Sequence, residues 1–128
     1  MNEYIDILMK YVSGTLEYKG RTGRSLFWKT FLCIFVLSAA LGLLCGTLHI
    51  LVGWVPLLGG LARTALNLIG ELGALVLWVP MIALGWRRMH DVGRDGWLFL
   101  IPVANLAFAV TAGEPDNRFG PQVPENER

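Results

Sequence analysis

The stretch LFWKTFLCIFVLSAALGLLC, residues 26–45, decides the fold class. It carries one charge, Lys29, close to its start. A helix of about 20 residues rises about 30 Å, which is the thickness of the hydrocarbon core of a bilayer. The stretch therefore predicts a transmembrane helix, which we place at residues 26–48.

A second stretch of the same kind, LNLIGELGALVLWVPMIALGW, covers residues 66–86. Its only interruptions are Asn67, Glu71 and Pro80, which packed membrane helices tolerate. It predicts a second transmembrane helix at residues 62–90. The composition agrees, because 16% of the 128 residues are charged and 54% are hydrophobic, whereas soluble domains carry about 25% charged residues. We expect an all-α membrane protein.

The first residues predict an amphipathic helix at residues 1–13. Apolar side chains such as Tyr4, Ile5 and Leu8 fall on one side of it, and polar ones such as Glu3 fall on the other. A glycine-rich linker follows at residues 14–25, and glycines and a proline break the apolar connection between the long helices at residues 49–61. A polar tail forms residues 112–128.

A third apolar run, WLFLIPVANLAFAV, covers residues 97–110 and predicts a short third helix at residues 97–111. It has about 14 residues, fewer than the usual 17 to 25 of a spanning helix, and Pro102 interrupts it. The run either spans the bilayer or enters and leaves it on one side, and the charges of the tail do not decide between these two paths.

Basic residues are concentrated at one end of each long helix. Lys10, Lys19, Arg21, Arg24 and Lys29 precede or open the first, and Arg87, Arg88 and Arg94 follow the second. The connection between the helices offers only Arg63. By the positive-inside rule both basic clusters, and with them the N-terminus, are expected on the cytoplasmic side. The polar opening of the chain is unlike a cleavable signal peptide, so the first helix is expected to stay.

Three motifs together carry a resemblance to a known family. They are KGRTGRSLFW (residues 19–28), RRMHDVGRDGW (residues 87–97) and NRFGP (residues 117–121). In order and spacing they resemble the domain-of-unknown-function 805 (DUF805) family of small bacterial inner-membrane proteins. Asp95 stands where the family usually has serine, and the third apolar run is shorter than is typical. The resemblance implies a location in the bacterial inner membrane and no particular reaction.

The motifs bring seven ionisable residues to the expected cytoplasmic face, and these form a candidate headgroup or salt-bridge cluster. They are Arg21, Arg24, Arg87, Arg88, His90, Asp91 and Arg94. In one interpretation the arginines, with Trp86 and Trp97, only anchor the helices at the interface. In the other, Asp91 pairs with Arg24 or Arg94, and the remaining guanidinium groups form a pocket for a lipid phosphate.

A polar stripe in the second long helix is formed by Arg63, Asn67 and Glu71, at four-residue intervals. A charge within the membrane is a candidate proton or cation site, and Arg63 or His49 could be the partner of Glu71. The structural alternative, in which Glu71 reaches the interface or bonds to Asn67, is favoured because no second polar helix completes a pathway.

Small residues at four-residue spacing predict close helix packing. They are Ser38, Gly42 and Gly46 in the first long helix, and Gly70 and Ala74 in the second. Packing between the two helices of one chain is favoured over a homo-oligomer, because each chain supplies both helices.

Three classes of function remain. The leading one is a non-catalytic membrane module that binds anionic lipid headgroups or a partner membrane protein through the arginine-rich face. The alternatives are a small transporter or channel component that uses Glu71, and an enzyme that acts on lipid headgroups through His90 and Asp91. We expect no catalytic residue, cofactor or metal, because adjacent His90 and Asp91 diverge on a helix and Cys33 and Cys45 lack metal-site spacing. The net charge of +1 gives no indication of nucleic-acid binding.

Overall fold

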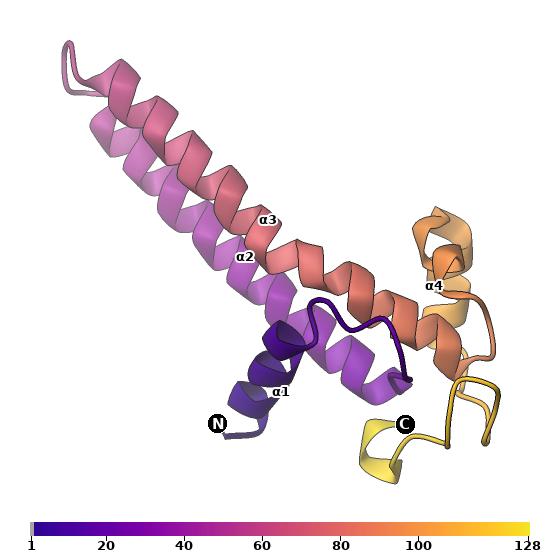
Figure 1. The fold of residues 1–128 in the computed structure, drawn as a ribbon. Coiled ribbons are helices and arrows are strands. Elements are labelled where there is room, and N and C mark those ends of the chain that lie inside the picture. Colours follow the sequence, from indigo (N-terminus) through magenta and orange to yellow (C-terminus); the bar gives the residue numbers. More distant parts are fainter. Residues whose placement is uncertain (1) are drawn as a thin grey trace. The chain divides into compact units, whose positions relative to one another are not determined.

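The computed structural model describes residues 2–128, and this part of the chain is helical without β-strands (Figure 1). The elements, in chain order, are α1 (Asn2–Ser13), α2 (Arg24–Val52), α3 (Gly59–Asp91), the 3-10 helix η1 (Gly96–Leu100), α4 (Pro102–Val110) and the 3-10 helix η2 (Glu125–Glu127). The expected all-α membrane fold, with an amphipathic first helix, two long apolar helices and a short third helix, is confirmed.

The two long helices have the length and surface of membrane spans. α2 has 29 residues and α3 has 33, and each contains an apolar window that could cross a bilayer. Only 6% of that window is buried in α2 and 28% in α3. A core helix of a soluble protein is mostly buried, whereas these helices leave most of their apolar side chains exposed, as membrane spans do.

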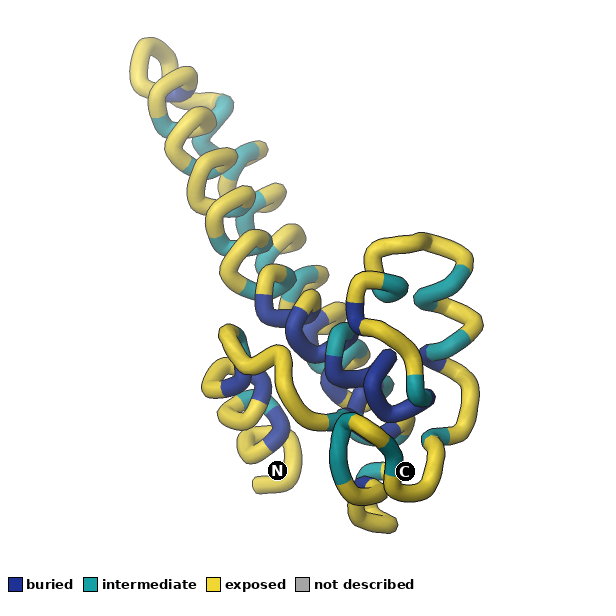
Figure 2. Tube along the Cα trace, turned by 45° about the vertical axis from the view of Figure 1, so that its right-hand side comes forward, coloured by how far each residue is buried: buried dark blue, intermediate teal, exposed yellow. Residues whose placement is uncertain are grey.

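The chain divides into two compact units. The first combines the chain up to Cys33 with Val79–Arg128, and the second is the hairpin Ile34–Trp78. Buried side chains are concentrated in the first unit (Figure 2). Its core is formed by Ile7, Tyr11, Phe27, Met81, Ala83, Leu84, Met89 and Val92. Thus α1 buries one side against the ends of α2 and α3 that belong to this unit.

Within the hairpin unit, α2 and α3 run antiparallel (Figure 1), and they pack closely at two glycines of α3. A Cβ added to Gly73 would lie 2.7 Å from a methyl carbon of Leu41, and one added to Gly70 would lie 3.7 Å from the Cys45 sulfur. Glycines in α3 therefore allow the α2 side chains to approach closely.

The short third helix returns to the end of α3 from which it starts. At its beginning, Gly96 lies directly against the ring of Trp86. At its end, Trp28 Nε1 donates to the Ala109 carbonyl at 3.0 Å, and Arg88 donates to the Thr111 carbonyl. The nine residues of α4 rise about 13 Å, less than half of a hydrocarbon core. α4 by itself is therefore shorter than a membrane span.

Candidate functional site

The centre of the first unit is a buried ionic cluster around Asp91, the last residue of α3. Arg88 Nη1 lies 2.6 Å from Asp91 Oδ2, and Arg21 Nη2 lies 2.9 Å from Asp91 Oδ1. All three side chains are buried: Arg88 is 0% exposed, Arg21 2% and Asp91 1%. One carboxylate thus bridges two guanidinium groups, and we call these three residues the clamp.

Backbone carbonyls accept the remaining hydrogen bonds of the clamp. Arg21 donates to the carbonyls of Pro115 at 2.8 Å and Gly120 at 3.0 Å, and also to that of Glu114. Arg88 donates to the carbonyls of Thr22, at 3.4 Å, and Thr111. Carbonyl oxygens carry partial negative charge, so they offset the excess positive charge that one carboxylate leaves. The clamp therefore joins the linker before α2, the end of α3 and the segment after α4.

Two glycines make room for the clamp. A Cβ on Gly113 would lie 2.1 Å from Asp91 Oδ2, so any side chain there would collide with the carboxylate. Gly93 has φ +71°, a conformation that favours glycine, and it turns the chain directly after α3. The Glu114 amide then donates to the Asp91 carbonyl at 2.8 Å.

The NRFGP motif completes the same structure. Asn117 Nδ2 donates to the His90 carbonyl at 3.0 Å, and Asn117 Oδ1 accepts from the Phe119 amide at 2.9 Å. The Phe119 ring stacks on the His90 ring at 3.9 Å, with 5° between the planes. His90 Nδ1 donates to the Gly20 carbonyl at 3.0 Å. The three sequence motifs therefore meet in one place.

The expectation that Asp91 pairs with Arg24 or Arg94 is wrong. Arg24 Nη1 donates to the Val110 carbonyl at 3.3 Å, and the Arg94 guanidinium lies over the Phe108 ring at 5.3 Å. Arg94 follows the Gly93 turn and is directed toward α4, while Arg24 lies on the exposed first turn of α2. Both residues remain exposed, whereas the linker brings Arg21 to Asp91.

Arg87 is buried in a different place. Its side chain is 9% exposed and lies 3.9 Å from Glu17 Oε2, with Nε donating to the Ala83 carbonyl at 3.4 Å. A Cβ on Gly14 would lie 2.8 Å from Arg87 Nη2. Arg87 therefore packs against the chain that follows α1 and is not part of the clamp.

Arg24 also lines a cleft of about 310 Å³ beside the clamp. The charged residues of this cleft are Arg24, Asp91, Glu114 and Arg128. Asp91 is already paired with both clamp arginines, and Glu114 Oε2 accepts from Asn117 at 3.3 Å. Arg128 donates from Nε to the Val123 carbonyl at 3.0 Å. The two exposed arginines are thus the charged groups of this cleft with donors to spare.

The polar stripe lies in the hairpin unit and has a different arrangement from the one expected. Among residues 2–128 Glu71 forms no ion pair with Arg63 or His49, the two partners that the sequence offered, nor with another residue. Arg63 instead packs on Gly53, where an added Cβ would lie 1.8 Å from its Nη2. His49, Asn67 and Glu71 line an open groove of about 380 Å³.

Of the small residues expected to pack the long helices together, some contact the neighbouring helix and others lie on open surface. Gly70 faces Cys45 across the hairpin, but a Cβ on Gly42 or Gly46 would meet nothing within 4 Å. Ser38 is half-buried, and its hydroxyl has no hydrogen-bond partner among the described residues. Ala74 is also half-buried.

Sequence reasoning missed four residues that shape this site: Gly113, Asn117, Phe119 and Arg128. The NRFGP motif was a usable signal for Asn117 and Phe119, because an asparagine side chain often accepts from the backbone amide two residues further on in an Asx-turn. For Gly113 and Arg128 the sequence offers no comparable signal, since their roles depend on contacts with distant residues.

Comparison with known proteins agrees with the motifs. The family model described as a protein of unknown function (DUF805) matches residues 15–121. Inner membrane protein YhaH of Escherichia coli (strain K12) is 31% identical, with 94% of this chain and 95% of the relative covered. Inner membrane protein YhaI of the same strain is 28% identical, with 94% and 93% covered. No solved structure matches the chain.

Proposed function

We propose, from the premise that the chain belongs to the DUF805 family, that it is a non-catalytic inner-membrane protein that binds anionic phospholipid headgroups. The binding site is the cleft of Arg24 and Arg128 beside the clamp. The observation that carries this proposal is the position of Arg24, an exposed arginine in the first turn of an apolar helix that opens onto a cleft of about 310 Å³.

The chemistry of the cleft suits a phosphate ester. An arginine can donate two parallel hydrogen bonds to phosphate oxygens, and Arg24 uses only Nη1, on the Val110 carbonyl. Trp28 lies one helical turn further along α2, bonded to the Ala109 carbonyl, and tryptophan is enriched at the level of headgroups. A phosphate in this cleft would therefore lie where lipid phosphates lie.

The side of the membrane follows from charge. The basic residues flank the ends of α2 and α3 that meet in the first unit, and the connection at the other end offers only Arg63. We place the first unit, with the N-terminus and the tail, on the cytoplasmic side.

A non-catalytic role is supported by the way the clamp uses its ionisable groups. Asp91 is paired with two arginines, and His90 is stacked on Phe119 with Nδ1 bonded to a carbonyl. A general base must reach a substrate proton within hydrogen-bond distance. Asp91 is not free to do so, and His90, whose ring Nε2 would be the basic nitrogen, is only 8% exposed, which argues against a headgroup enzyme at this position.

A transporter or channel component is the second candidate, and the groove in the hairpin favours it. Glu71 is exposed there, and a carboxylate within a membrane helix is a candidate ion or proton site. Ion flux in liposomes that Glu71→Gln abolishes would support this candidate, while flux equal to that of empty liposomes would remove it.

Native mass spectrometry of protein released from a lipid-preserving extract tests the lipid proposal. We expect adducts with the masses of anionic phospholipids on the wild type, reduced about tenfold in Arg24→Gln and Arg128→Gln, because each loses a charge-assisted contact. Arg94→Gln is the matched control, since Arg94 is exposed but lies over Phe108 outside the cleft. Equal adducts in all four proteins would contradict the proposal, and a protein-sized adduct lost in Arg24→Gln would indicate a partner protein instead.

A further inference from the structure

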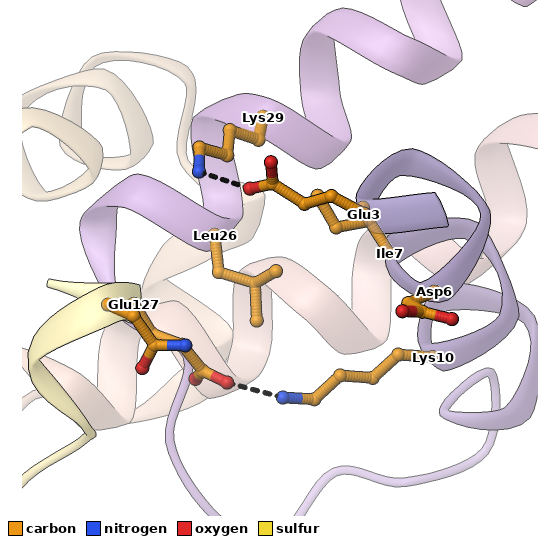
Figure 3. A pocket seen from close by; sticks show the side chains of 8 residues that line it. Glu3, Asp6, Ile7, Lys10, Leu26, Lys29 and Glu127 are labelled. Carbon is orange, nitrogen blue, oxygen red and sulfur yellow. Dashed lines mark hydrogen bonds and ion pairs between the residues drawn. The ribbon is translucent and has the colours of Figure 1, made fainter. Parts of the chain in front are cut away.

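A second cavity, of about 410 Å³, lies between α1, the start of α2 and η2, all within the first unit (Figure 3). Two ion pairs bound it. Lys29 Nζ lies 2.7 Å from Glu3 Oε1, and Lys10 Nζ lies 2.6 Å from Glu127 Oε1. Each of these two edges of the cavity therefore carries one lysine paired with one glutamate.

One carboxylate of the cavity has no cation of its own. Asp6 lines the cavity beside the two lysines and two glutamates, and it forms no ion pair with any of the described residues. The hydrogen bond and charge of Lys29 lower the pKa of the Glu3 carboxyl, so this acid is ionised at neutral pH. The side chains that line the cavity therefore carry one more negative than positive charge, and this surplus favours a ligand with a cationic group.

The lysines can still bind an anion. Each ammonium has three N–H donors, and one is used on a glutamate, so others can donate to phosphate oxygens. A ligand with both charges would place an ammonium at Asp6 and a phosphate at the lysines. A simple anion would be repelled by the surplus acid, and a simple cation would leave the lysine donors unused.

The position of the cavity favours a lipid as the source of such a ligand. Lys29 lies in α2, five residues after its start at Arg24, and an apolar segment follows. Ile7 and Leu26 give the cavity an apolar lining between its charged edges (Figure 3). This level of a membrane helix is the headgroup layer. We propose that this cavity binds the zwitterionic headgroup of an ethanolamine phospholipid.

The proposal distinguishes ethanolamine from choline. A primary ammonium donates three hydrogen bonds and fits against a carboxylate, whereas a quaternary ammonium has no N–H donor. Asp6 should therefore select ethanolamine phospholipids over choline phospholipids that have the same acyl chains.

Native mass spectrometry of the full chain in nanodiscs with equal amounts of the two lipids tests this selection. We expect the wild type to retain the ethanolamine lipid about tenfold more than the choline lipid, and Asp6→Asn to bring this ratio close to one. Lys29→Gln should reduce the retention of both lipids, because both need the phosphate contact. Glu17→Gln is the charge-matched control, since Glu17 is exposed and lies outside the cavity.

Three results would overturn the proposal. They are equal retention of the two lipids by the wild type, an unchanged ratio in a helical, folded Asp6→Asn variant, and displacement of the lipid by an equal concentration of soluble phosphoethanolamine. The last result would identify a small zwitterion as the ligand. None of these readouts involves Arg24 or Arg128, so this proposal and the anionic-lipid proposal fail independently.

Discussion

Replacing Asp91 with asparagine keeps the size of the side chain and removes the charge that holds Arg21 and Arg88. These guanidinium groups are 2% and 0% exposed, so water cannot replace the lost carboxylate. Breaking a buried ion pair by removing one partner costs about 3–5 kcal/mol. Because Asp91 serves two arginines, we expect a loss of about 4 kcal/mol or more, a large part of the 5–15 kcal/mol that stabilises a typical domain.

Denaturant unfolding in detergent micelles measures this loss, with tryptophan fluorescence as the signal. Trp86 reports on the clamp's own unit, because its ring contacts Tyr18 edge-on at 5.5 Å. Asp95→Asn is the matched control. Its ion pair with Arg118 is 56% and 64% exposed, and pairs of this kind contribute less than about 1 kcal/mol. Equal losses of unfolding free energy in Asp91→Asn and Asp95→Asn would show that the buried ion pairs of Asp91 contribute no more to stability than an exposed pair.

Three further predictions address individual contacts of the first unit. Gly113→Ala places a Cβ 2.1 Å from Asp91 Oδ2 and should lower the unfolding free energy by about 1–3 kcal/mol. Gly42→Ala, at a position with open space around it, should leave the unfolding free energy unchanged. Equal effects of the two variants would contradict the clamp geometry. Phe119→Ala removes the ring stacked on His90 and should lower the unfolding free energy by about 2 kcal/mol. Phe119→Tyr keeps the ring, and its unfolding free energy should stay near that of the wild type. A similar loss in both variants would mean that the stacking does not stabilise the unit. Burial raises the pKa of Tyr11 from 10.0 to about 12, so the stability that the neutral phenol contributes is fully present below pH 10 and should decline as the pH rises toward 12. Over this range the unfolding free energy should fall less steeply in Tyr11→Phe than in the wild type. Identical slopes in the two proteins would contradict the burial of the neutral phenol.

The long helices were predictable from sequence because each is an unbroken apolar run, and the cost of exposing backbone groups to lipid permits few structures other than a helix there. The stretch at residues 26–48 lies inside α2 for this reason. The path of the third helix was not predictable, because its length is between that of a span and that of a surface helix. In the structure Trp28 and Arg88 contact the end of this helix, and these contacts join residues far apart in the chain.

The three residues of the clamp were predictable as candidates, but their pairing was not. The arginines and Asp91 stood out because charges are rare in an apolar chain, but which arginine reaches Asp91 depends on how the linker folds back over α3. Arg21 lies 70 residues from Asp91 in sequence, and Gly113 makes room for their contact from a third segment. Such three-way packing leaves no periodic pattern in the sequence.

The sidedness of the linker and the tail tests whether both belong to one unit on the cytoplasmic side of the membrane. In a chain with Cys33→Ala and Cys45→Ala, single cysteines replace Lys19 and Gln122, which are both exposed on the first unit. A membrane-impermeant thiol reagent should label both positions in inverted membrane vesicles and neither in intact spheroplasts. Labelling of the two positions from opposite sides would show a third crossing, and it would contradict the clamp that joins the linker to the tail.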